Sequence, residues 1–183
     1  LRVTRSGSVF SLILLTFRNI HNVKLSFANA YRYLDNKEMD CMRYVLENDT
    51  LRVEIDSFGA ELKSVKRKSD DKEYMWYADK KYWGRTSPVL FPFVGNCRNK
   101  EYRYGGKTYA IGQHGFARDM EHTMESRTED TIWFSLHSNE ETMEKYPFAF
   151  VLKIGYNLTG NELKVMWKVE NPDTKTLYFS IGA

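Results

Sequence analysis

The sequence predicts a predominantly antiparallel β protein, a sandwich or an open barrel, and three observations support this prediction. Apolar and polar side chains alternate along several short segments, which is the period of a strand with one buried face. Turn residues separate these segments, as in all-β domains. No stretch of ten or more residues shows convincing helical periodicity.

The first predicted strand after Met42 is Leu51–Ile55, in which apolar residues alternate with charged ones. A turn over Ser57–Ala60 leads into a second strand, Glu61–Lys66. A basic cluster at the end of this strand is followed at once by acidic residues: Lys63, Lys66, Arg67 and Lys68, then Asp70, Asp71 and Glu73. These charges nearly cancel, which favours a solvated hairpin end over a phosphate-binding patch.

Two hairpins are predicted further along the chain. Tyr102–Tyr104 and Lys107–Tyr109 flank Gly105-Gly106, and glycine supplies the positive φ that two-residue hairpin turns require. A longer hairpin runs through Phe148–Leu158, a Thr159-Gly160-Asn161 turn and Leu163–Val169, with apolar residues at every second position. Ile132–Leu136 and Leu177–Ile181 complete the predicted strands. The last strand has no sequence after it to cover its edge, and an unpaired edge predicts a chain that is cut short.

Residues 1–41 differ in composition from the rest of the chain. All four Trp, all four Pro and ten of the eleven Gly follow Cys41. Six of the 27 basic and three of the 24 acidic residues precede Met42, which leaves 21 of each in residues 42–183. The first segment therefore carries the whole net charge of +3, and we divide the chain into a leader, 1–41, and a domain, 42–183.

The leader holds an apolar run, Val9–Phe17, after two arginines and before the small triplet Ala28-Asn29-Ala30. This layout resembles a secretory signal, but charged residues interrupt the stretch between the run and the triplet, where a signal is uncharged. The run is also too short to span a membrane, which takes about 18 apolar residues. Because the chain opens on Leu1, we favour Met42 as the natural start and attach no function to the leader.

Several classes of protein are excluded or disfavoured. Cys41 and Cys97 alone make neither a disulfide framework nor a thiolate zinc site, and a cytoplasmic location is the simpler expectation. Phosphate loops, His-Glu metal pairs and nucleophile elbows do not occur, which removes P-loop enzymes, zinc proteases and α/β-hydrolases. We expect no metal or cofactor. A neutral domain also disfavours nucleic acid as a partner.

Two segments could carry chemistry. Gly112–Asp119 is a polar island in which His114 sits on flexible backbone between glycines, where it could face a ligand or make a structural hydrogen bond. His122, in a charged surface-like run, and His137, on the polar side of its strand, are weaker candidates. Tyr82–Arg98 is dense in aromatics, Pro and Gly, which suits either a sugar site or a core strand with an aromatic plug.

Five motifs occur in order between residues 48 and 183: EIDSFGAELKSVK, YWGRTSPVLFPFVGN, YRYGGKTYAIGQHGFARD, EKYPFAFVLKIGY and FSIGA. Through these motifs the segment resembles the N-terminal half of an aldose 1-epimerase, or mutarotase, in a branch near the hexose-6-phosphate mutarotases. The resemblance implies an incomplete galactose mutarotase-like β-supersandwich that binds a sugar or sugar phosphate without a metal. It implies acid–base ring opening by a Glu and a His that lie beyond Ala183, so this chain alone is expected to bind sugar poorly and to be inactive.

The resemblance also implies substrate-binding residues within the chain. His114 matches a substrate-contacting His, and its neighbour Gln113 is included with it. Asn96 stands where the family has a sugar-contacting Arg. Arg98 comes two residues later, which places it on the same face of a strand, and there it could replace that Arg. A non-catalytic carbohydrate-binding β-sandwich is the alternative function.

Overall fold

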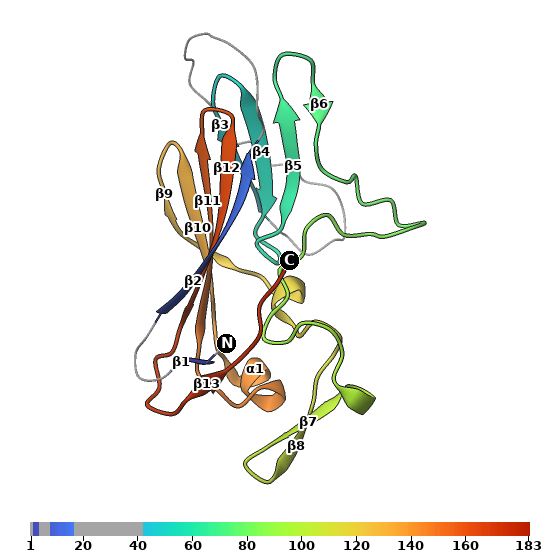
Figure 1. Cartoon of the computed structure of the whole chain (residues 1–183), viewed down its shortest axis with the longest axis vertical. Helices are drawn as coiled ribbons and strands as arrows, with labels where there is room; N and C mark the ends of the chain where they lie inside the picture. Colours follow the sequence, from blue (N-terminus) through green and yellow to red (C-terminus); the bar gives the residue numbers. More distant parts are fainter. Residues whose placement is uncertain (1, 4–7, 17–41) are drawn as a thin grey trace.

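The computed structural model describes residues 2–3, 8–16 and 42–183, which form mostly antiparallel strands (Figure 1). The strands are β1 (Arg2–Val3), β2 (Ser8–Thr16), β3 (Arg43–Glu47), β4 (Leu51–Asp56), β5 (Leu62–Arg67), β6 (Lys72–Glu73), β7 (Glu101–Tyr104), β8 (Lys107–Ala110), β9 (Thr123–Arg127), β10 (Thr131–His137), β11 (Val151–Thr159), β12 (Glu162–Glu170) and β13 (Leu177–Tyr178). The helical elements are short: η1 (Arg98–Lys100), η2 (Ala117–Asp119) and α1 (Glu140–Lys145).

Two sheets form the body of the described fold, which confirms the predicted antiparallel β class. One has the order β3-β4-β5-β6 and the other β2-β12-β11-β10-β9. Val53 and Phe134, one from each sheet, are both 0% exposed and belong to one apolar core. The buried Tyr156 hydroxyl of β11 donates a hydrogen bond to the Ala60 carbonyl, 2.7 Å away, at the turn before β5. This bond joins the two sheets directly.

The alternation patterns place most strands correctly. β11 and β12 pair over nine positions, from Val151 opposite Glu170 to Thr159 opposite Glu162. The β7–β8 hairpin turns through Gly105 and Gly106 at φ of 55° and 78°, as predicted. The basic cluster lies at the β5–β6 hairpin, where Arg67 pairs with Asp70, so a hairpin end is confirmed there.

Two strand predictions need correction. The segment Tyr82–Arg98 forms no strand and holds only isolated bridges, because Pro88 and Pro92 have no N–H to donate. Its aromatic plug is present, since Phe91 is 0% exposed among other rings. Leu177–Ile181 is strand only at Leu177–Tyr178, and that strand pairs on one edge with β1 in a sheet of two strands. That the chain is cut short stays a prediction.

The apolar run of the leader lies in the second sheet. β2 pairs with β12 over nine positions, from Ser8 opposite Glu170 to Thr16 opposite Glu162. Neither interpretation of the leader, as a secretory signal or as sequence upstream of a start at Met42, predicts this pairing. The Ala28-Asn29-Ala30 triplet lies outside the described residues, and a natural start at Met42 stays a prediction. Among the described residues, no helix is long and apolar enough to cross a membrane.

Candidate functional site

The polar island is held against the buried Phe91 by its backbone. The N–H groups of Phe116 and Ala117 both donate to the Phe91 carbonyl, at 3.0 and 3.2 Å. Gly115 has a φ of 74°, and a Cβ there would lie 2.2 Å from the Phe91 oxygen. Only glycine therefore fits at this contact, and the contact positions the backbone of the preceding residue, His114.

His114 is half-buried and is tied to the neighbouring loop by two hydrogen bonds. Its backbone N–H donates to the Gly95 carbonyl at 2.8 Å, and its Nδ1 accepts from the Gly95 N–H at 2.9 Å. Because Nδ1 is an acceptor, the proton of the neutral ring must sit on Nε2. His114 thus presents an N–H donor on the side of the ring that faces away from Gly95.

Gln113 is exposed beside that donor. Its Nε2 lies 3.2 Å from the His114 Nε2. Two N–H donors cannot bond to each other, so the His114 proton is available to a ligand or, after rotation of the amide, to the Gln113 oxygen. The structure brings these two predicted residues together.

The two remaining predicted residues, Asn96 and Arg98, do not lie on one strand. Asn96 is exposed and follows Gly95, so it lies next to the backbone that holds His114. Arg98 begins η1, and the residues from Asn96 to Arg98 are not a strand. The prediction that Asn96 and Arg98 share a strand face is therefore wrong, and within the described residues no hydrogen bond joins Arg98 to His114.

Two arginines near His114 were not singled out from the sequence. The Arg118 Nη2 donates to the Gln113 carbonyl at 3.0 Å, and the Arg85 Nη1 donates to the Arg118 carbonyl at 2.9 Å. Arg85 also forms an ion pair with Asp119. Arg118 lies in the polar island and Arg85 in the aromatic segment. Neither their spacing in the sequence nor their neighbours indicated that they meet.

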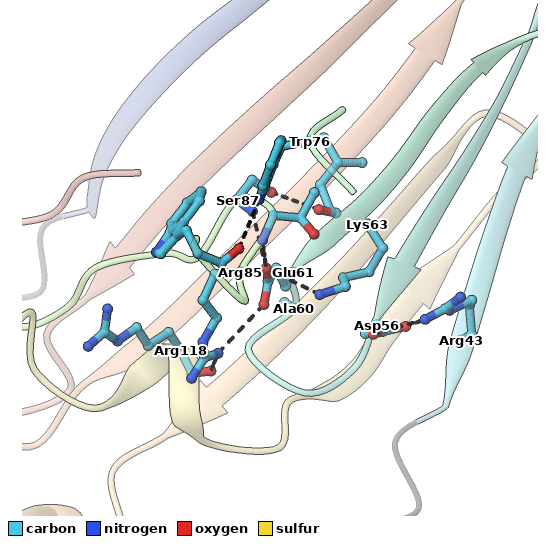
Figure 2. A network of polar contacts seen from close by, with 12 residues as sticks. Arg43, Asp56, Ala60, Glu61, Lys63, Trp76, Arg85, Ser87 and Arg118 are labelled. Atoms are coloured by element: carbon cyan, nitrogen blue, oxygen red, sulfur yellow. Dashed lines mark hydrogen bonds and ion pairs between the residues drawn. The ribbon is translucent and has the colours of Figure 1, made fainter. Parts of the chain in front are cut away.

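A buried carboxylate connects Arg85 to the first sheet (Figure 2). Glu61 is 3% exposed, and its Oε1 accepts from the N–H groups of Thr86 and Ser87 at 2.6 and 3.1 Å. Its Oε2 lies 3.6 Å from the Arg85 Nη1, and Lys63 lies 3.3 Å from Oε1. Charge-assisted bonds to a buried carboxylate hold the Arg85 segment in place.

His122 is buried, so its predicted surface-like position is wrong. It is 2% exposed, and its Nδ1 lies 3.0 Å from the Met120 carbonyl, to which it donates. Its Nε2 has no hydrogen-bond partner in the part of the chain that the structure describes. Burial lowers the pKa of His122 to about 4, which keeps the ring neutral near pH 7. His137 is exposed at the end of β10, as expected.

Metal-ligating side chains do not gather at this site. Among the described residues, no group of three or more His, Cys, Asp or Glu could hold a metal ion. The site consists of His114 and two neutral amides beside a cluster of paired charges.

Comparisons with known proteins point to one family. Residues 42–183 match the aldose 1-epimerase family. The chain is 36% identical over 148 residues to the LacX proteins of Lactococcus lactis, covering 78% of this chain and 49% of theirs. A galactose mutarotase related enzyme from Lactobacillus acidophilus is 46% identical with a TM-score of 0.75, covering 76% of this chain and 47% of that one. A galactose mutarotase-like protein from Lactobacillus casei is 39% identical with a TM-score of 0.73, over 76% and 47%.

A more distant structure, a putative aldose 1-epimerase from Escherichia coli, is 18% identical with a TM-score of 0.63 and shares the fold over 77% of this chain and 50% of its own. The galactose mutarotase-like fold is thus shown, and the chain spans about half the length of the relatives that it matches. By its match over residues 42–183, this chain belongs to the aldose 1-epimerase family.

Proposed function

We propose that the whole protein is an aldose 1-epimerase and that this chain supplies part of its sugar-binding site. The observation that carries the proposal is the fixed tautomer of His114. Its Nδ1 is capped by the Gly95 N–H at 2.9 Å, which leaves a neutral Nε2–H to donate to a sugar oxygen. Gln113 and Asn96 add exposed amides that can donate to or accept from hydroxyls.

Interconversion of anomers requires two proton carriers. A base removes the proton of the anomeric hydroxyl while an acid protonates the ring oxygen; the ring opens, the C1–C2 bond rotates, and closure gives the other anomer. His114 would bind a sugar oxygen and steady negative charge that develops there. A base must come from another group.

Neither nearby carboxylate suits that role. Glu61 is buried and accepts two backbone N–H bonds, and Asp119 is paired with Arg85. We therefore place the catalytic His and Glu in the part of the relatives' length that this chain does not match. Membership of the aldose 1-epimerase family supports an aldohexose or a hexose phosphate as the sugar.

Polarimetry tests the proposal on this chain extended by a segment that corresponds to the part of the relatives' length it does not match. Fresh α-glucose or α-galactose should approach equilibrium faster than in buffer, and His114→Ala should reduce that acceleration. His137→Ala is the matched control, because His137 is exposed on β10 away from the loop. No acceleration by the extended protein would refute the proposal.

A non-catalytic carbohydrate-binding β-sandwich is the second candidate, and the engaged carboxylates favour it. In that case calorimetry would show sugar binding that depends on His114, while the extended protein would leave the rate of mutarotation unchanged.

A further inference from the structure

Arg85 is surrounded by acceptors from its own chain. One terminal nitrogen donates to the Arg118 carbonyl at 2.9 Å and lies 3.6 Å from the Glu61 carboxylate. The other terminal nitrogen is paired with the Asp119 carboxylate. A guanidinium binds a phosphate through pairs of parallel N–H donors, and here both terminal nitrogens of Arg85 already contact acceptors of the protein.

Asp119 lies between two arginines. Besides its pair with Arg85, its Oδ2 is 3.5 Å from the Arg118 Nε. The Asp119 N–H donates to the Phe116 carbonyl at 2.9 Å, so the loop that carries His114 also fixes this residue. An incoming phosphate would have to displace the carboxylate or lie beside it, and both cost free energy through lost pairing or like-charge repulsion.

The charges of the cluster come close to balance. Arg85, Arg118 and Lys63 face Glu61 and Asp119, with Lys63 at 3.3 Å from Glu61. Three cations against two carboxylates leave one net positive charge. The neighbouring loop offers the neutral groups of His114, Gln113 and Asn96.

We propose that Asp119 is a specificity-determining residue that occupies the donors of Arg85 and so restricts the site to uncharged aldohexoses, against hexose phosphates. This inference rests on the proposed function, because it concerns which sugar that site accepts. The opposite arrangement would be a phosphate site, in which the N–H donors of the same arginines face the ligand.

The test compares Asp119→Asn with Asp70→Asn. Each change removes one carboxylate from an exposed Arg–Asp pair, but Asp70 pairs with Arg67 at the β5–β6 hairpin. Calorimetry or ligand-observed NMR would measure binding of glucose, glucose 6-phosphate and inorganic phosphate to the full chain. Circular dichroism would confirm that both variants fold, as expected for side chains that are 47% and 48% exposed.

The unmodified chain should bind glucose more tightly than glucose 6-phosphate. Asp119→Asn should raise the affinity for inorganic phosphate about tenfold, since one negative charge close to the ligand is removed, and should raise the ratio of glucose 6-phosphate to glucose affinity equally. The gain should shrink as salt is added. Asp70→Asn should show no gain, and adding Arg85→Gln to Asp119→Asn should abolish it.

Three results would overturn the inference: tighter binding of glucose 6-phosphate by the unmodified chain, no gain in phosphate affinity in Asp119→Asn, or a gain that survives Arg85→Gln. A gain of phosphate affinity in Asp119→Asn, together with an extended protein that neither binds glucose nor accelerates mutarotation, would refute the sugar-binding function and still support the masking of Arg85. The two proposals therefore fail separately.

Discussion

Replacing Gly115 with alanine should destabilise the protein by about 3 kcal/mol and displace His114. A non-glycine residue at the φ of 74° costs about 1 kcal/mol. The new Cβ would lie 2.2 Å from the Phe91 oxygen, which is backbone and cannot rotate away. Relief of this overlap separates the Phe116 and Ala117 N–H groups from that oxygen, at about 1 kcal/mol for each lost hydrogen bond.

Gly106→Ala is the matched control. Gly106 has a φ of 78°, and a Cβ there meets nothing within 4 Å, so only the backbone cost of about 1 kcal/mol applies. The gain from a stiffer unfolded chain is the same for both variants and cancels in their difference. Urea unfolding should therefore show Gly115→Ala less stable than Gly106→Ala by about 2 kcal/mol.

The His114 ring gives a second readout. Its ¹⁵N resonances should change in Gly115→Ala, because the Gly95–His114 bonds depend on the position of this loop, and should not change in Gly106→Ala. Equal destabilisation of the two variants, with unchanged His114 resonances, would refute the anchoring role of the Phe91 contact.

Three further predictions concern buried polar groups. His122 has a pKa of about 4 when folded and about 6.5 when unfolded, so its contribution to the free energy of unfolding is complete above pH 6.5, and about 3 kcal/mol of it is lost as the pH falls from 6.5 to 4. His122→Gln should flatten the pH dependence of urea unfolding in that range. An unchanged pH dependence would contradict this prediction. Glu61→Gln should lower the free energy of unfolding by about 2 kcal/mol, because an amide nitrogen would then face Arg85 or Lys63. A variant as stable as the original chain would show that the carboxylate is not needed. Tyr156→Phe removes the buried 2.7 Å bond between the sheets and should cost about 1 kcal/mol in thermal unfolding, whereas no loss would mean that the hydroxyl is dispensable.

The strands could be predicted because each has its own local signal. In most of β4 and β11, buried residues alternate with partly buried ones according to the sheet face they occupy. Gly105-Gly106 specifies its turn without help from the rest of the chain. Pro88 and Pro92 are also local signals, and they explain why Tyr82–Arg98 forms no strand.

The contacts of the site could not be predicted in the same way, because they join loops that are far apart in sequence. Arg85 meets Arg118 and Asp119 across more than 30 residues, and no periodicity links them. The period-2 argument for Arg98 failed because it assumed a strand. His122 lies among charged residues in sequence, yet it is buried, immediately before β9.

The charged and neutral groups of the site are arranged in opposite ways. The ionised side chains, Arg85, Arg118, Glu61 and Asp119, face one another, whereas His114 has its one protonated nitrogen unshared with the backbone. Pairing of the charges lowers the cost of holding them partly buried, and it also removes them as partners for a ligand. Recognition is then left to neutral N–H and C=O groups, which exchange hydrogen bonds with sugar hydroxyls at little electrostatic cost. A site organised in this way gains little from a charge on its ligand, and that is the physical basis for expecting Asp119 to set the preference for an uncharged sugar.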